Sequence, residues 1–190
     1  QYGAADAEYR TERESFSKVI SYGVAGNGPA WFKVWTKGGQ ILEYGNTADS
    51  RIEAQGKTTV RVWAVSKLSD TKGNYLAVSY GEDSSNGDFF PAAIDYTGNS
   101  GLQASNLVQL NYEEARADRF LKYQGGSAIK ATVRLQNVKL YYAATLVREY
   151  RVGYDQASYT QRSLITSVRE CSSDGVNCLS PTALGWNPGG

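Results

Sequence analysis

The sequence contains no histidine and no methionine. Without histidine the chain cannot form a Ser-His-Asp triad, a Cys-His dyad or an HExxH zinc site, and it lacks the side chain that most often transfers protons near neutral pH. Most common hydrolase mechanisms are therefore excluded. Because methionine is absent, Gln1 is not expected to be the natural start of translation, and we expect the chain to be a processed or excised piece of a larger protein.

An excess of one charge and long apolar runs are also missing. The 20 lysines and arginines are scattered among 19 aspartates and glutamates, so no basic face is expected for a phosphate backbone. No apolar run approaches the roughly 20 residues that a membrane span needs. We expect no nucleic-acid partner and no membrane span. The length of 190 residues suits a single β-sheet segment over 1–190, in which 1–15 form a flexible or strand-pairing terminus.

Cysteine is scarce, with only Cys171 and Cys178, which flank a polar loop that contains Asp174 and Gly175. A loop of this kind can fold back and bring two sulfurs within bonding distance, so Cys171 and Cys178 are a candidate disulfide. Whether the bond forms depends on the compartment, and a pair of reduced thiols fits the spacing equally well. Two thiolates without histidine leave half of a zinc shell unfilled, so we expect no metal site, no cofactor and no catalytic residue.

Glycine, asparagine and aromatic residues are abundant, and they are distributed as in a β protein. Turn signals such as Lys37-Gly38-Gly39 and Thr97-Gly98-Asn99 recur along most of the chain, and both residue types tolerate the positive φ of tight hairpins. Stretches rich in β-branched and aromatic residues lie between them. The predicted strands are Trp31–Thr36, Gly39–Tyr44, Thr58–Lys67, Tyr75–Tyr80, Ala92–Tyr96, Leu107–Tyr112, Ala131–Tyr142, Thr145–Tyr154 and Ser163–Glu170.

Hydrophobic alternation supports these strands. In Thr58–Lys67, Val60, Val62 and Ala64 fall on one face, a period of two that is typical of a strand. Only Tyr112–Lys122 has helical propensities, and we expect one helical turn there. The fold class is therefore all-β: an antiparallel meander of about nine strands with Gly and Asn turns and at most one short helix. Self-association through exposed sheet edges is also expected.

One segment has the form of a known repeat unit. A strand ends at the turn Asp70-Thr71-Lys72-Gly73-Asn74, a second strand ends in Tyr80, and a third closes on Ile94-Asp95-Tyr96. Asp70 can accept backbone N–H groups within the turn while Gly73 or Asn74 takes the left-handed conformation. This order resembles the Rhs/YD unit, which makes Asp70, Gly73 and Asn74 candidate structural turn residues.

The flanking sequence extends the resemblance over nearly the whole chain. In the right order, Ala30–Gly56, Leu146–Gln156 and Ser163–Trp186 are similar to the virulence-plasmid B protein family and to the B component of insecticidal toxin complexes. The resemblance implies a non-catalytic wall or cap segment of a secreted bacterial β-shell that encloses a toxin, with the rest of the Rhs/YD shell and other toxin-complex components as partners. The family more often has Arg-Pro-Asp where this chain has Arg116-Ala117-Asp118, so the loop after Tyr112 is expected to differ.

Two other functions are compatible with the sequence. Trp31, Trp35, Trp63, Tyr141 and Tyr142 fill the core or the shell wall in the first interpretation, but on exposed strands they would form a glycan-binding face of a carbohydrate-binding or adhesin-like module. That alternative requires at least three rings on one exposed sheet face. An enzyme is the third possibility, through a pair of carboxylates suited to glycoside hydrolysis. Its candidates are Asp49, Glu53, Asp95, Glu113 and Asp118.

Overall fold

The computed structural model describes residues 3–114 and 116–187. The chain divides into two compact units. The first unit comprises Gln1–Ser105 together with Lys122–Ile129, and the second comprises Asn106–Leu121 together with Lys130–Gly190. Each unit is built on antiparallel strands that are connected largely by tight turns, and the two are described separately.

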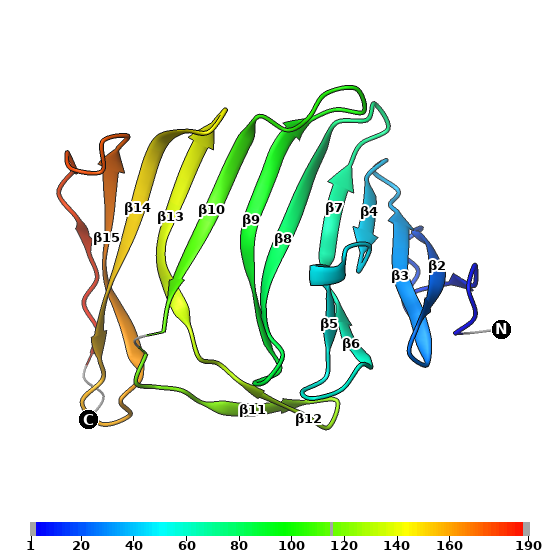
Figure 1. Ribbon diagram of the computed structural model, residues 1–190, viewed down its shortest axis with the longest axis horizontal. Coiled ribbons are helices and arrows are strands. Elements are labelled where there is room, and N and C mark those ends of the chain that lie inside the picture. The colour runs from blue at the N-terminus through cyan, green and yellow to red at the C-terminus, as the bar shows by residue number, and fades with distance from the viewer. Residues whose placement is uncertain (1–2, 115, 188–190) are drawn as a thin grey trace. The chain divides into compact units, whose positions relative to one another are not determined.

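The first unit contains an antiparallel sheet with the strand order β1-β2-β3-β4-β7-β8-β9, shown in blue to green in Figure 1. Two short hairpins, β5-β6 and β11-β12, are separate from this sheet. The bounds are β1 Glu8–Tyr9, β2 Lys18–Ala25, β3 Gly28–Trp35, β4 Ile41–Tyr44, the 3-10 turn η1 Ala48–Ser50, β5 Arg51–Glu53, β6 Val60–Trp63, β7 Val65–Ser69, β8 Tyr75–Asp83, β9 Asp88–Gly98, β11 Leu121–Gln124 and β12 Ser127–Lys130.

The second unit contains antiparallel strands in the order β10-β13-β14-β15-β16. Its two longest strands, β14 and β15, pair from Arg148 opposite Ser172 to Gln156 opposite Ser163. The last strand, β16, pairs with β15 over only two residues. The bounds are β10 Asn106–Glu113, β13 Arg134–Tyr142, β14 Thr145–Gln156, β15 Ser163–Ser172 and β16 Thr182–Ala183.

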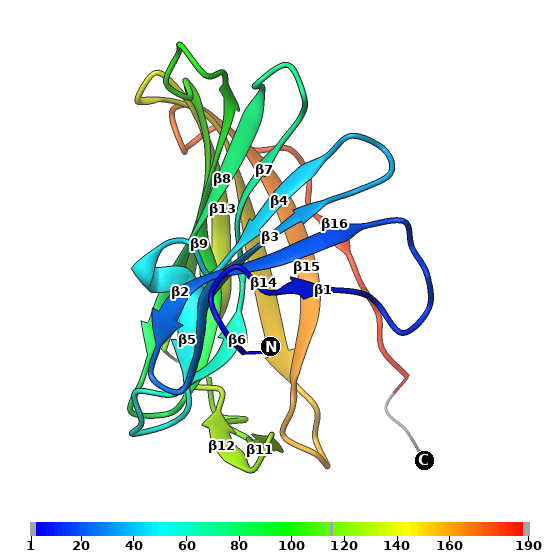
Figure 2. The same cartoon turned by 90° about the vertical axis from the view of Figure 1, so that its right-hand side faces the viewer.

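The hairpin β11-β12 lies against β5 and β6 (Figures 1 and 2). The backbone N–H of Gln55 donates to Ser127 Oγ over 3.1 Å, and Arg61 Nη1 donates to Gln124 Oε1 over 2.9 Å. Ile129 at the end of the hairpin is only 3% exposed. A segment distant in sequence thus covers a small part of the first unit.

Few apolar side chains are fully buried. Among the described residues, the buried hydrophobic side chains are Ile52, Val60, Ala64 and Ile129 in the first unit and Ala131 and Cys171 in the second. Most strand residues are half-buried instead. Interiors of two packed layers normally bury many large side chains, so within each unit the main sheet has little of a second layer.

The first unit's sheet has two chemically different faces. Cross-strand neighbours align on one face as an apolar ladder, and all of its members are half-buried. The adjacent positions on the opposite face form a charged ladder, in which Lys33 lies 3.8 Å from Glu43. Alternation of side chains along each strand produces this separation. The apolar ladder is Val19, Val34, Leu42, Leu68 and Leu76, and the charged ladder is Lys33, Glu43 and Lys67.

The predicted all-β antiparallel meander is confirmed, but the predicted helical turn over Tyr112–Lys122 is wrong. β10 continues to Glu113, an irregular loop follows, and β11 begins at Leu121, while Ala115 lies outside the described residues. The loop is fixed by a side-chain pair between Arg116 and Asp118, which overrides the local helical propensity. Among the residues that the structure describes, the short helical element is η1 instead.

The predicted strand Thr58–Lys67 is divided in the structure. β6 pairs with β5 and β7 pairs with β4, and the division falls at Ala64. Ala64 donates its backbone N–H to Ser50 O and accepts from the N–H of Gly45, so its backbone bonds go to two different segments. Sequence analysis did not predict β1, β2, β5, β11, β12 or β16, most of which are only two to four residues long.

Candidate functional site

Trp31 and Trp35 lie four residues apart on β3 and therefore on the same face of the strand. Trp31 stacks on Tyr22 of β2, with ring centroids 4.3 Å apart. The Nζ atoms of Lys18 and Lys33 lie 5.6 and 5.4 Å from the centroid of the Trp35 ring. Both tryptophans are half-buried. Neighbouring side chains therefore occupy part of the ring surface that stacking on a sugar would need.

Trp63 packs on the opposite side of β3. Its ring meets Phe32 edge-on with centroids 5.1 Å apart, and Phe32 alternates with Trp31 along the strand. The indole N–H of Trp63 donates to the carbonyls of Pro29 and Ala30, each at 3.1 Å. The three tryptophans consequently do not form one coplanar face. Trp63 fixes the β6 segment to β3, which is a packing role.

Tyr141 and Tyr142 end β13 in the second unit, apart in the chain from the tryptophans of the first. Being consecutive on a strand, they point to opposite faces, and Tyr142 is 61% exposed whereas Tyr141 is half-buried. The tight connection to β14 follows through Ala143 and Ala144, both at positive φ. The five aromatic residues singled out from the sequence do not converge on one surface within either unit.

The turn Asp70–Asn74 connects β7 to β8. Asp70 Oδ1 accepts the backbone N–H groups of Lys72 at 2.8 Å and Asn74 at 3.0 Å, and Asn74 Nδ2 donates to Asp70 Oδ2 at 2.8 Å. These bonds, that of the Asn74 side chain first, lower the pKa of Asp70. Gly73 has φ +84°, and a Cβ there would lie 2.7 Å from Ser100 Oγ. Glycine is thus required by backbone conformation and by space.

Two further turns use the same pairing of aspartate and asparagine. Asp83 accepts from the backbone and side chain of Asn86 before β9, and Asp174 accepts from the backbone and side chain of Asn177 after β15. A positive-φ glycine accompanies each turn, as Gly87 and Gly175. The sequence predicts a polar loop around Asp174 and Gly175 and a turn at Asn86-Gly87-Asp88, but the pairing of aspartate with asparagine was not predicted, although an Asp followed three residues later by Asn beside a glycine is a recognisable signal.

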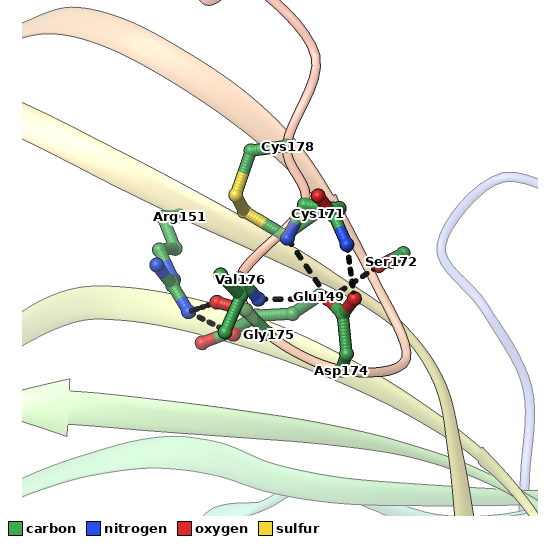
Figure 3. Close-up of a disulfide and its surroundings, with 9 residues drawn as sticks. Glu149, Arg151, Cys171, Ser172, Asp174, Gly175, Val176 and Cys178 are labelled. Atoms are coloured by element: carbon green, nitrogen blue, oxygen red, sulfur yellow. Dashed lines mark hydrogen bonds and ion pairs between the residues drawn. A yellow bond between two sulfur atoms is a disulfide. The ribbon is translucent and has the colours of Figure 1, made fainter.

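Cys171 and Cys178 form a disulfide across an antiparallel bridge, with their Cα atoms 3.9 Å apart (Figure 3). Cys171 is 1% exposed and lies opposite Glu149 of β14, which is itself 5% exposed. Arg151 Nη2 bonds to Glu149 Oε2 at 2.8 Å and to the carbonyl of Gly175 at 2.7 Å. The buried carboxylate is therefore neutralised by an arginine that also holds the disulfide loop.

A second polar cluster, which sequence analysis missed, is centred on Asp118. Its carboxylate pairs with both ends of the Arg116 guanidinium at 3.0 and 3.1 Å and accepts the N–H and Oγ–H of Ser163 at 2.9 and 2.7 Å. Arg134 donates to Ser163 Oγ and pairs with Glu113. The bonds from Arg116, with those from Ser163, hold the pKa of Asp118 well below its usual range. We call these five residues the Asp118 cluster.

The carboxylates considered for glycoside hydrolysis fall into different surroundings. Glu113 and Asp118 share the Asp118 cluster, where each is matched by an arginine. Asp49 and Glu53 lie near Glu82, and burial together with these two charges raises the pKa of Glu82. Asp49 accepts the backbone N–H of Tyr80 at 2.8 Å. Asp95 lies on β9 opposite Ala77.

Two general properties of the described residues concern metal binding and membrane crossing. Among residues 3–114 and 116–187, no group of three or more Asp, Glu, Cys or His side chains could hold a metal ion. Over the same residues, no helix has the length and apolar character needed to cross a membrane. The well-defined side-chain arrangements in these residues are the turns, the polar clusters and the two sheet faces.

Comparison with known proteins gives similarity in structure but not in sequence. No protein-family model and no curated protein sequence matches the chain. The N-terminal domain of the effector protein SpvB from Salmonella typhimurium strain LT2 has a TM-score of 0.71 at 16% identity, over 85% of this chain and 67% of that chain.

TcdB2-TccC3 is a second similar structure, with a TM-score of 0.73 at 18% identity over 91% of this chain. TcdB2-TccC3 without its hypervariable C-terminal region gives the same values. The chain spans only 11% of the length of TcdB2-TccC3. The predicted resemblance is thus confirmed in structure: this chain has the β fold found in the SpvB N-terminal domain and in TcdB2-TccC3.

Proposed function

We propose that the chain is a non-catalytic wall or cap segment of a secreted, toxin-enclosing β-shell of the Rhs/YD type, and that its partners are the remaining shell and other toxin-complex components. The observation that carries the proposal is the apolar ladder. Its five side chains extend across β2, β3, β4, β7 and β8, yet none of them is among the fully buried residues. A ladder of this length is stabilised when another layer or an enclosed chain covers it.

The polar groups support a structural role. Asp70, Asp118 and Asp174 each accept at least three hydrogen bonds from nearby turn or strand atoms. Carboxylates held in this way have lowered pKa values, the opposite of what a general acid near neutral pH requires. They stabilise turns and loops at the margins of the sheets.

The fold similarity and the disulfide add context to the proposal. TcdB2-TccC3 contains this fold as a small part of a much longer chain, as a wall segment would be. A disulfide between Cys171 and Cys178 is typical of proteins that experience an oxidising compartment, in agreement with secretion. The glycan-binding alternative has less support, because Trp63 lies on the other side of β3 from Trp31 and Trp35.

Side-chain footprinting with hydroxyl radicals tests the proposal. The isolated chain is compared with the complete product of its gene, and we expect Leu42, Leu68 and Leu76 to be labelled in the former and protected in the latter. Unchanged labelling of these leucines would refute the shell role. Binding of the isolated chain to a glycan array, abolished by Trp31→Ala, would favour the carbohydrate-binding module instead.

A matched pair of variants sharpens this test. Leu68 belongs to the apolar ladder and its neighbour Lys67 to the charged ladder, so the two side chains point to opposite faces. Leu68→Asn in the complete product should expose an enclosed domain to added protease, whereas Lys67→Asn should not. Equal protease sensitivity of the two variants would contradict the assignment of the apolar face to the covered side.

A further inference from the structure

The disulfide loop 171–178 connects two otherwise separate features of the second unit: Arg151, which pairs with the buried Glu149, and the C-terminal tail that runs along β15. We propose that this loop is a redox-sensitive latch: thiol reduction of Cys171–Cys178 releases the loop from Arg151 and detaches the tail, residues 179–186, from β15. The inference goes beyond the shell role and does not depend on it, because the latch is a property of the chain alone.

The first half of the latch is the connection to β14. Arg151 Nη2 divides its hydrogen bonds between Glu149 Oε2 and Gly175 O, and Figure 3 shows these groups directly beside the disulfide. Glu149 is buried, so it requires Arg151 whether or not the loop is present, whereas the loop gains its contact only when Gly175 is held in place. The disulfide therefore adds a covalent closure to a loop in which Gly175 N–H also donates to Ser172 O over 3.0 Å, and it does not determine the pairing of Glu149.

The second half of the latch is the tail. Leu179 N–H donates to Glu170 O at 2.8 Å, Leu184 N–H donates to Thr166 O at 2.9 Å, and Trp186 Nε1 donates to Ile165 O at 2.7 Å. The side chains of Leu179, Leu184 and Trp186 are 65%, 40% and 53% exposed, so the tail buries little apolar surface. An edge segment with few backbone bonds and little burial belongs to the least stable part of a structure.

Cys178 is covalently fixed one residue before Leu179, which places the start of the tail beside β15. Without the bond, docking of the tail must also overcome the entropy of bringing its first residue back to β15, which the disulfide otherwise fixes. The neighbouring Asp174–Asn177 turn keeps its hydrogen bonds, and the N–H of Ser172 still donates to Asn177 O over 2.8 Å, but the covalent link from Cys171 to Cys178 is gone. Tail docking thus depends on the disulfide.

The reaction balances with a thiol reductant of the glutathione or dithiol class. A reductant thiolate attacks one sulfur, the Cys171–Cys178 bond breaks, and a mixed disulfide forms with one protein thiol released. A second reductant thiolate displaces the other cysteine, so the reductant is oxidised to a disulfide and the protein gains two electrons and two protons. Cys178 is the more accessible sulfur, because Cys171 is 1% exposed and Cys178 is half-buried.

Hydrogen exchange with mass spectrometry on the full chain tests the latch. After equilibration in a glutathione buffer at cytosolic poise, we expect the amides of residues 179–186 to exchange at least about tenfold faster, while those of β14 stay within about twofold. A Cys171→Ala/Cys178→Ala variant should exchange like the reduced chain, with or without reductant. Asp174→Ala is the matched control, because it removes the turn's hydrogen bonds but retains the disulfide, and it should leave the exchange of residues 179–186 unchanged.

Three results would overturn the latch. The first is equal exchange of the tail in the oxidised chain and in a chain whose reduction is verified by thiol labelling. The second is a rise of exchange in β14 as large as that in the tail, which would make the disulfide a general staple of the second unit. The third is a bond that resists the glutathione buffer, because cellular thiols could then not operate it.

Discussion

The two units of this protein differ in how they stabilise a sheet that has little of a second layer. The first unit buries Ile52, Val60 and Ile129 between small hairpins. The second unit relies instead on the Asp118 cluster, the Glu149–Arg151 pair and a disulfide. Small cores supply limited stabilisation, and covalent or charged cross-links then contribute a larger share. The two units should accordingly respond to different perturbations.

Truncating Ile52, the least exposed apolar side chain among the described residues of the first unit, should have the largest effect. Ile52 is 2% exposed, and Ile52→Ala should lower the free energy of unfolding by about 2 to 5 kcal/mol through lost burial and the remaining cavity. Chemical denaturation, with hydrogen exchange to assign the loss to the first unit, measures this. Leu102→Ala removes a similar volume from a side chain that is 72% exposed and should cost less than about 0.5 kcal/mol. Equal losses would show that the first unit has no effective core.

The second unit should be most sensitive at its central carboxylate. Asp118→Asn retains the shape but removes the charge that pairs with Arg116 and leaves one Ser163 bond mismatched, for an expected loss of roughly 1.5 to 3 kcal/mol. Denaturation monitored in the second unit measures it. Asp155→Asn, on an exposed residue of β14, is the control and should be nearly neutral. A neutral Asp118→Asn would mean that the cluster contributes no stability.

Acid should weaken the second unit through the same carboxylate, Asp118. The folded-state pKa of Asp118 is lowered, so its stabilisation is fully present above the unfolded pKa and is lost as the pH falls toward the folded value. Because unfolded aspartate titrates near about pH 3.9, the loss should begin below roughly pH 5. Wild-type second-unit stability should fall more steeply over that range than that of Asp118→Asn. Parallel pH curves for the two proteins would contradict the assignment.

Much of the fold could be predicted from the sequence because alternation and turn chemistry are local. The turn Asp70–Asn74 and eight of the nine predicted strands correspond to single elements of the structure. The exception, Thr58–Lys67, divides at Ala64 because the β5-β6 hairpin is inserted between β4 and β7, and no local pattern encodes that insertion.

The polar clusters could not be predicted for a related reason. Asp118 bonds to Ser163 over a separation of 45 residues, and neither residue is unusual in its own stretch of sequence. A second contact of Asp118 explains the wrong helical turn, because its carboxylate holds Arg116 in a loop that propensity alone would have made helical. The glycan alternative depended on which face each tryptophan occupies, and pairing register decides that.

The turn of the first unit should respond to backbone strain. Gly73 has φ +84° and faces Ser100, so Gly73→Val should destabilise by about 1 to 3 kcal/mol. Lys72→Ala, at the exposed neighbouring position, should stay within about 0.5 kcal/mol. Equal denaturation midpoints for the two variants would show that this segment is not a strained turn. The repeat-unit interpretation would then lose its local support.

The smallest expected loss of stability is in the charged ladder, through which the first unit also gains some electrostatic stabilisation. Lys33 Nζ lies 3.8 Å from Glu43 and 5.4 Å from the centroid of the Trp35 ring, and both carboxylate and lysine side chains are partly exposed. An exposed ion pair contributes about 0 to 1 kcal/mol and an exposed cation–π contact about 0.5 to 1 kcal/mol, so Lys33→Met, which keeps the apolar stem, should cost about 0.5 to 2 kcal/mol. The cost should shrink in high salt because screening weakens the ion pair already in the wild type. Lys57→Met, at an exposed position, is the matched control. A loss for Lys33→Met as large as that for Asp118→Asn would erase the contrast between the units, since charge would then stabilise both sheets equally.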